Sequence, residues 1–172
     1  MRVALVAKPG HEATGVGRYT SELRAALEAL GHEVVVVHPI VPLPRIVVRA
    51  VRRLLGWDLA AFLDNYPVWA RYPEADIYHI TSQNLATLIL WRRPPGPTVI
   101  TVHDIIPWLV RHDPELRIYE HRVAEWFDQL ALAGLRRADA LVVDSAFTQA
   151  SLRQAGVAVG LAEIERGHGS NR

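Results

Sequence analysis

The sequence predicts an α/β fold in which a Rossmann-like parallel sheet carries helices on both faces. Five short apolar runs alternate along the chain with segments of helical periodicity. Most of these runs lack the polar–apolar alternation of a strand with one solvent-facing side, so both faces of the sheet are predicted to be buried. The first run also leads through a glycine-containing loop into a helix, which is typical of a βαβ unit.

The composition fits one domain of this class. The chain has 172 residues, of which 50% are hydrophobic, enough for a buried core. A net charge of +1 gives no field that would favour nucleic acid, and the lack of cysteine excludes disulfides and thiolate metal sites. The N-terminus enters a strand without a signal sequence, and no apolar run approaches the roughly 18 residues of a membrane span. A soluble, cytoplasmic protein is therefore expected.

The first 38 residues form the predicted βαβ unit. Residues 2–7 are an apolar run of strand length, residues 8–17 form a loop with three glycines, and residues 34–37 are four consecutive valines. Between them, apolar side chains recur at helical spacings, at Tyr19, Leu23, Ala26, Leu27 and Leu30. Gly31 follows, where a left-handed residue would end the helix. A helix N-terminus preceded by glycines suits a phosphate-bearing ligand.

Residues 40–57 contain four arginines and no acidic residue. A helix would place the arginines on one face and an apolar set opposite; the arginines are Arg45, Arg49, Arg52 and Arg53, and the apolar residues are Val47, Val48, Val51, Leu54 and Leu55. Two interpretations stay open. The helix lies on an anionic membrane surface as a peripheral contact, or it is a surface helix with solvated arginines and its apolar side in the core.

Three further strands follow, at residues 76–80, 98–102 and 140–143, with an apolar helix at 84–90 between the first two. The run at 98–102 is rich in β-branched residues, which favours a strand.

Two more helices are predicted from capping signals. Asp113 and Pro114 form an N-cap followed by proline at the first turn. The helix that they open would carry an apolar stripe of Leu116, Tyr119, Val123, Trp126, Phe127 and Leu130. Ser145 can cap a last helix that contains Phe147 and Leu152.

Ligands of such sheets bind at the carboxyl ends of the strands. That edge would gather the glycine loop, His38, His79, His103, Asp104, Asp144 and Ser145. An imidazole beside a carboxylate at a strand end can orient a hydroxyl or move a proton, so His103 and Asp104 are candidate catalytic residues. The alternative is that His103 bonds a backbone carbonyl and Asp104 caps a turn. His79 and Ser145 are likewise candidate substrate contacts, or a packing residue and an N-cap.

The sequence lacks the motifs of other common ligand sites, such as those for dinucleotides, nucleotide phosphates and metal ions. A dinucleotide fingerprint would need a glycine where Thr20 stands and an acid after the second strand, where His38 and Pro39 stand. No Gly-Lys-Ser/Thr follows the loop, no Asp-x-Asp occurs, and no histidine pair has metal-ligand spacing. No metal and no cofactor are therefore expected.

Five motifs occur in order within residues 1–157: Thr14–Tyr19, Leu27–Val34, Asp76–His79, Thr101–Pro107 and Arg137–Ser145. Together they resemble the N-terminal domain of GT-B-fold glycosyltransferases, specifically the large retaining family 4. The resemblance implies that a nucleotide-sugar lies between two Rossmann-like domains. It implies that Gly15, Val16, Gly17 and Arg18 lie at the donor phosphates. It also implies that His103, supported by Asp104, contacts the transferred sugar or the acceptor hydroxyl.

The resemblance also implies a division of the chain. Residues 1–157 would be the acceptor-side domain and residues 158–172 a truncated linker. The family's donor-holding pair of glutamates, eight residues apart, is absent. A C-terminal domain or separate partner chain would supply it. The alternative is a non-catalytic binding or assembly module that has lost its second domain.

Overall fold

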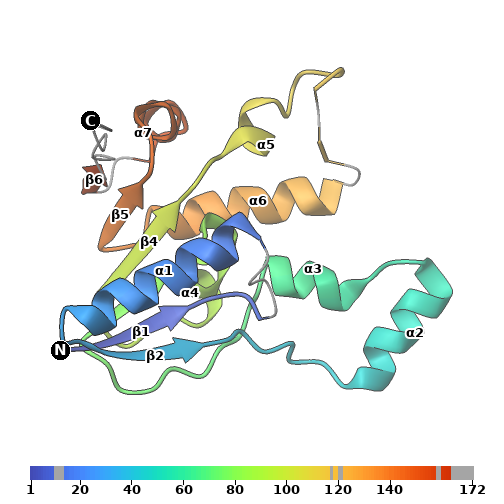
Figure 1. The fold of residues 1–172 in the computed structure, drawn as a ribbon. Coiled ribbons are helices and arrows are strands. Elements are labelled where there is room, and N and C mark those ends of the chain that lie inside the picture. Colours follow the sequence, from blue (N-terminus) through green and yellow to red (C-terminus); the bar gives the residue numbers. More distant parts are fainter. Residues whose placement is uncertain (10–13, 117, 120–121, 158–159, 164–172) are drawn as a thin grey trace.

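A computed structural model describes residues 1–9, 14–116, 118–119, 122–157 and 160–163. Within them, six parallel strands form one sheet in the order β2-β1-β3-β4-β5-β6 (Figure 1). The strands are β1 (Arg2–Val6), β2 (Glu33–Val37), β3 (Ile77–Ile80), β4 (Thr98–Val102), β5 (Ala140–Val143) and β6 (Leu161–Glu163). The α/β class with a Rossmann-like parallel sheet is confirmed.

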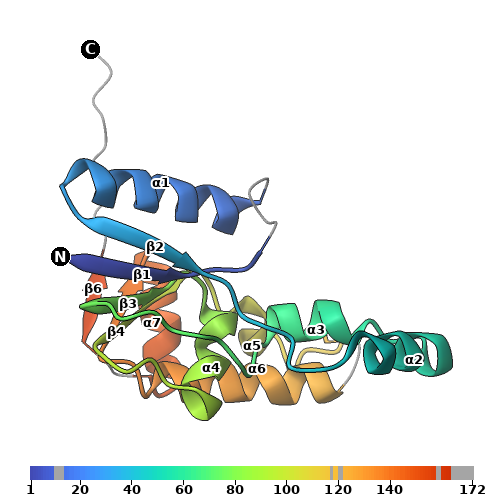
Figure 2. The ribbon, with the colours of Figure 1, turned by 90° about the horizontal axis from the view of Figure 1, so that it is seen from below.

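Helices cover both faces of the sheet. Helix α1 lies on one face, and α4 and α6 lie on the other (Figure 2). The helices are α1 (Gly15–Ala29), α2 (Arg45–Leu55), α3 (Leu59–Asn65), η1 (Gln83–Ala86), α4 (Thr87–Trp91), α5 (Ile106–Leu109), α6 (Arg122–Leu135) and α7 (Ala146–Gln154). None of the helices in the described residues combines the length and the apolar character needed to cross a bilayer.

The core lies between the sheet and the helices η1, α4, α6 and α7, whereas α1 contributes no buried residue. Its fully buried strand residues include Leu5, Ile80, Ile100 and Leu141. Gly134 lets α6 lie directly against η1, because a Cβ there would stand 2.1 Å from the Ala86 carbonyl oxygen. The buried sheet therefore holds the strand ends, and the residues that follow them, in fixed positions.

The chain reverses its direction across the sheet at β1. It moves outward from β1 to β2 and then crosses back to β3 on the other side of β1. The loops after β1 and β3 therefore diverge and leave a crevice at their carboxyl ends, where open parallel sheets bind ligands.

The prediction of a helix start at Asp113 is wrong. The Asp113 carboxylate accepts the backbone amides of Glu115 (2.9 Å) and Leu116 (3.3 Å) and closes a turn, while the helix α6 begins at Arg122. Aspartate followed by proline favours turns as strongly as helix starts, and here the turn prevails. Residues 117, 120 and 121 of the predicted helix lie outside the described residues.

The interpretation of residues 45–57 as a helix with its apolar side in the core is also wrong. Helix α2 forms as predicted, yet none of its residues is buried. Ile46, Leu54 and Leu55 are 72%, 79% and 73% exposed. Helix α2 stands out from the body of the molecule, beyond α3 (Figure 2), which keeps this apolar side away from the core.

The sheet continues past residue 157. Strand β6 pairs in parallel with β5, with Leu141 opposite Leu161 and Val143 opposite Glu163. The sequence predicts no strand there, because three residues are too few to show a period. The remainder of the predicted linker, residues 158–159 and 164–172, lies outside the described residues.

Candidate functional site

A crevice opens where the first turn of α1 faces the ends of β4 and β5. Its volume is about 650 Å³. It is lined by Gly15, Val16, Arg18, Tyr19, Glu22, His103 and Asp144. Four of the predicted site residues thus come together, although up to 88 positions separate them in the sequence (from Gly15 to His103).

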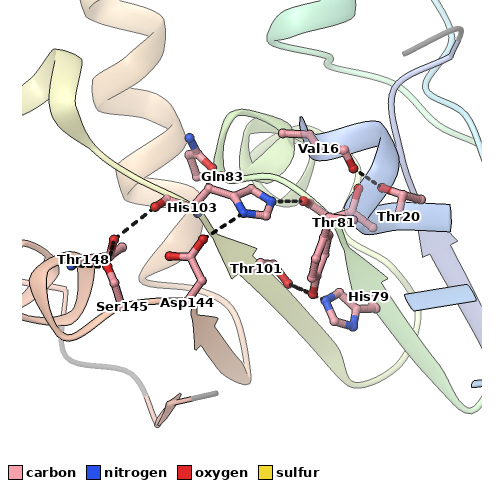
Figure 3. A network of polar contacts seen from close by, with 11 residues as sticks. Val16, Thr20, His79, Thr81, Gln83, Thr101, His103, Asp144, Ser145 and Thr148 are labelled. Atoms are coloured by element: carbon pink, nitrogen blue, oxygen red, sulfur yellow. Dashed lines mark hydrogen bonds and ion pairs between the residues drawn. The ribbon is translucent and has the colours of Figure 1, made fainter. Parts of the chain in front are cut away.

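His103 is fixed in this crevice through both ring nitrogens (Figure 3). Its Nε2 lies 3.1 Å from the Thr81 carbonyl oxygen and its Nδ1 lies 3.4 Å from the Asp144 carboxylate. Its backbone amide donates to the Gln83 side-chain oxygen at 3.3 Å, and the Tyr19 ring stands edge-on at 5.0 Å. Both partners are hydrogen-bond acceptors. A protonated ring has two N–H groups and can donate to both partners, whereas a neutral ring can donate to only one.

His79 lies in the layer beneath His103 and does not line the crevice. Its Nε2 lies 2.7 Å from the Thr101 hydroxyl, which is also 2.7 Å from the Tyr19 hydroxyl (Figure 3). Burial, together with a smaller contribution from the nearby His103, lowers the pKa of His79 to about 4. A neutral ring that is hydrogen-bonded under the crevice supports Tyr19 and Thr101 and matches the packing interpretation.

The glycine loop enters α1 through an N-cap. Thr14 accepts the Gly17 amide at 3.1 Å, so this amide is already engaged. A Cβ on Gly15 would meet no atom within 4 Å, and the space in front of the first turn is open. Gly10, earlier in the loop, lies outside the described residues. The amides of Gly15 and Val16 in the first turn need partners from outside the helix.

Asp104 and Ser145 act locally. Asp104 accepts the Ile106 amide at 3.1 Å, which agrees with the alternative prediction that Asp104 caps a turn. It lines a smaller hollow that His103 does not reach. Ser145 caps α7 by accepting the Thr148 amide at 3.1 Å. The Thr148 hydroxyl in turn donates to the His103 carbonyl at 3.0 Å. Ser145 therefore reaches His103 only through Thr148.

A second cavity, of about 780 Å³, lies beside the end of β1. Its wall includes four aromatic rings, two amides and two charged side chains: Trp57, Phe62, Tyr66, Tyr119, Asn65, Asn84, Lys8 and Asp64. Lys8 donates to the Asn65 side chain, which also accepts from Asn84 at 2.9 Å. Burial lowers the pKa of Lys8, while the Asp64 charge opposes this shift. Aromatic faces beside amides and a cation suit a polyhydroxylated ligand.

A smaller hollow of about 230 Å³ shares Tyr66 and Asn84 with this cavity. It is lined by two carboxylates, Asp104 and Asp128. Burial raises the pKa of Asp128, the Asp104 charge adds to the shift, and a hydrogen bond from Tyr119 opposes it. Among the described residues, no three His, Asp or Glu side chains gather where they could hold a metal ion.

The strand-end rule that selected His103 also places Asp144 at this edge, because Asp144 follows β5 as His103 follows β4, but the sequence assigns it no role. Lys8 and Tyr19 line these cavities and are absent from the predicted site. Tyr19 reads as a core-facing helix residue in the sequence, and only the packing of α1 against β4 turns its hydroxyl toward Thr101.

Comparison with known proteins agrees with this architecture. The family model for Glycosyltransferase Family 4 matches residues 13–164. The fold is similar to the crystal structure of a ugt transferase from Siraitia grosvenorii in complex with UDP, with a TM-score of 0.51 and 11% sequence identity over 96% of this chain and 48% of that chain. The chain thus spans about half the length of that transferase.

A search of the curated proteins finds no match. The identity to the solved transferase is low enough that this likeness shows the fold alone, whereas the family match spans most of the sequence. Three of the five motifs that carry the predicted resemblance, Thr14–Tyr19, Thr101–Pro107 and Arg137–Ser145, also contribute residues to one crevice. The chain belongs to Glycosyltransferase Family 4.

Proposed function

We propose that residues 1–157 form the acceptor-side, N-terminal half of a retaining glycosyltransferase with a GT-B fold. Such an enzyme moves a sugar from a nucleotide-sugar to an acceptor hydroxyl and leaves a nucleoside diphosphate. The observation that carries the proposal is the crevice that joins the first turn of α1 to His103 in a chain of family 4. The UDP in the structurally similar transferase supports a nucleoside diphosphate as the ligand.

The donor diphosphate would lie at the first turn of α1. Gly15, Val16 and Arg18 line the crevice there, and first-turn amides and a guanidinium are groups that can stabilise phosphate charge. His103, when protonated, adds a positive charge on the opposite wall, held between Thr81 and Asp144. These groups would stabilise the negative charge that builds up on the departing diphosphate.

The acceptor would enter the cavity beside Lys8. Its aromatic rings can stack on the faces of a sugar ring, and Asn65, Asn84 and Lys8 offer donors and acceptors for hydroxyl groups. A second Rossmann-like domain, from the same longer protein or from a separate chain, would hold the nucleotide and close the crevice. The cytoplasmic location, the metal-free chemistry and the linker role of residues 158–172 remain predictions.

A screen of nucleotide-sugars against the full-length or reassembled protein tests this function, with release of nucleoside diphosphate as the readout. We expect one donor class to be turned over, and little or no turnover by residues 1–172 alone. His103→Ala should lower kcat roughly a hundredfold, the usual effect of removing one charge-stabilising group. His112→Ala is the matched control, because His112 is exposed and lines neither cavity.

A reassembled protein that turns over no nucleotide-sugar contradicts the proposal and leaves the non-catalytic module as the function. Strong transfer by residues 1–172 without any partner contradicts the division of labour between two domains. Equal activity of the His103 and His112 variants contradicts the role of His103 but not the activity itself.

A further inference from the structure

The two walls of the crevice belong to elements that bury little surface against each other. One wall is the first turn of α1, and the other is formed by His103 and Asp144, which follow β4 and β5. Helix α6, on the other face of the sheet (Figure 2), buries residues such as Leu132 and Leu135, whereas none of the 15 residues of α1 is buried. A sheet usually holds a helix by burying its apolar side. The position of α1, and with it the width of the crevice, therefore depends on other contacts.

The Tyr19 hydroxyl makes a contact of this kind. It lies 2.7 Å from the hydroxyl of Thr101, a fully buried residue of β4. Between the described residues, this is the one hydrogen bond that joins a side chain of α1 to a strand. The Thr101 hydroxyl is also 2.7 Å from His79 Nε2. Because a hydroxyl can donate to one partner and accept from another, Thr101 can satisfy Tyr19 and His79 together.

The three groups of this contact are uncharged at neutral pH. Burial raises the pKa of Tyr19, so its hydroxyl keeps its hydrogen. Burial also lowers the pKa of His79 to about 4, so its ring is neutral. Breaking a hydrogen bond between buried polar groups leaves them without the partners that water would supply, which costs free energy. The chain from Tyr19 through Thr101 to His79 can therefore hold α1 against β4.

The Tyr19 ring also contacts the opposite wall of the crevice. Its centroid is 5.0 Å from that of the His103 imidazole, and the two ring planes meet at 83°. This edge-to-face geometry is one that aromatic rings prefer. Tyr19 also follows Arg18 directly on α1, and both residues line the crevice. One side chain thus sets the distance of α1 from β4 and limits the tilt of His103.

We propose that Tyr19 is a positioning residue that fixes the first turn of α1 relative to His103. The reaction that it serves rests on the proposed function, in which both walls stabilise the same departing diphosphate. A displacement of about 1 Å between such groups can lower a rate about a hundredfold. The Tyr19 hydroxyl is engaged with Thr101, so Tyr19 acts through the two walls of the crevice and not through the substrate.

Hydrogen exchange and NMR of the 172-residue chain test the position of α1 without any substrate. Tyr19→Phe keeps the ring and removes the hydroxyl. We expect the backbone amides of residues 18–22 to exchange roughly tenfold faster, because α1 opens from the sheet more readily, and the His103 ring signals to shift. Tyr72→Phe is the matched control. It removes another half-buried hydroxyl, which donates to the Arg92 carbonyl at 2.8 Å, and should leave both measurements unchanged.

Kinetics of the full-length or reassembled protein test the role in sugar transfer. Tyr19→Phe should lower kcat roughly tenfold, since the two walls lose their fixed separation. The KM for the acceptor should stay unchanged, because Tyr19 does not line the cavity beside Lys8. Thr101→Val removes the other hydroxyl of the same contact. The double variant should therefore lose no more activity than Thr101→Val alone.

The proposal is overturned if Tyr19→Phe matches the wild type in exchange, spectrum and kcat. It is also overturned if Tyr72→Phe gives the same changes, which would show a general loss of stability. Additive losses in Tyr19→Phe and Thr101→Val overturn it as well, because the two hydroxyls would then act separately. A reassembled wild type that transfers no sugar contradicts the proposed function, and hydrogen exchange and NMR then decide alone whether Tyr19 holds α1 in place.

Discussion

Strand β4 and helix α2 are both apolar stretches, and the fold uses them in opposite ways. Four of the five residues of β4 are buried, and β4 positions His103 at its end. No residue of α2 is buried, and its apolar side faces outward. A strand must pair with neighbours to satisfy its backbone and so becomes part of the core, whereas a helix satisfies its own backbone. Apolar composition therefore predicts burial more safely for a strand than for a short helix.

Removing the same side chain from each region gives the largest contrast. Leu141 in β5, the neighbour of β4, is fully buried, and Leu54 in α2 is 79% exposed. Leu141→Ala should lower the free energy of unfolding by about 2 to 5 kcal/mol, because it leaves a cavity in the core. Leu54→Ala should change it by less than about 0.5 kcal/mol. Urea denaturation measures both, and similar losses would show that α2 packs against the protein in solution.

The pH dependence of the free energy of unfolding tests whether His79 is buried beneath the crevice. Burial lowers the pKa of His79 from 6.5 to about 4, so the unfolded chain binds more protons than the folded chain between these values. The stability is full above pH 6.5 and falls as the pH drops toward 4. Between pH 7 and pH 5 this group should remove about 2 kcal/mol.

His79→Asn should remove that part of the slope, whereas His112→Asn, at an exposed position, should keep it. The pKa of Asp128, raised by burial, acts in the opposite sense and is common to all three proteins. Denaturant titrations at several pH values give the slopes. Identical slopes for the wild type and His79→Asn would mean that His79 is accessible to water rather than enclosed under the crevice.

The smallest effect is expected at the contact between His103 and Asp144. At 3.4 Å this contact is long, so Asp144→Asn should lower the stability by about 1 kcal/mol or less. The hydrogen bonding of the ring should nevertheless change, because the amide that replaces the carboxylate can donate as well as accept. Nitrogen NMR should show a shifted Nδ1 signal, while Nε2 keeps its contact with the Thr81 carbonyl oxygen. Glu22→Gln, a change on the opposite wall of the crevice, should leave the spectrum unaltered.

The strands were predictable because parallel strands buried on both faces leave continuous apolar runs in the sequence. Strand β4 occupies residues 98–102 as predicted, and β3 and β5 agree to within one residue. The start of α6 was not predictable from its capping signal, because Asp113 can satisfy either a helix or a turn with the same carboxylate. Tertiary contacts decide between two local solutions of similar energy.

The location of the candidate site in the fold was predictable from the sequence, but the hydrogen-bond partners of its residues were not. The strand-end rule brings His103 and the first turn of α1 to one crevice, and the structure agrees. The partners of His103 are a backbone carbonyl after β3 and a carboxylate after β5, which lie far from it in the sequence. Asp104, its sequence neighbour, instead accepts the Ile106 amide in a local turn. Adjacent residues after a strand need not share a cavity.

The amino-acid order alone specifies the parallel α/β class, the glycine-led first helix, the basic amphipathic character of residues 45–55 and the membership of family 4. These properties depend on periodicity and local motifs, which are short-range. The pairing of His103 with Asp144, the neutral His79 beneath it, the cavity beside Lys8 and the exposure of α2 depend on contacts between distant segments. Such contacts follow from the packing of whole elements, so three-dimensional structure is needed to see them.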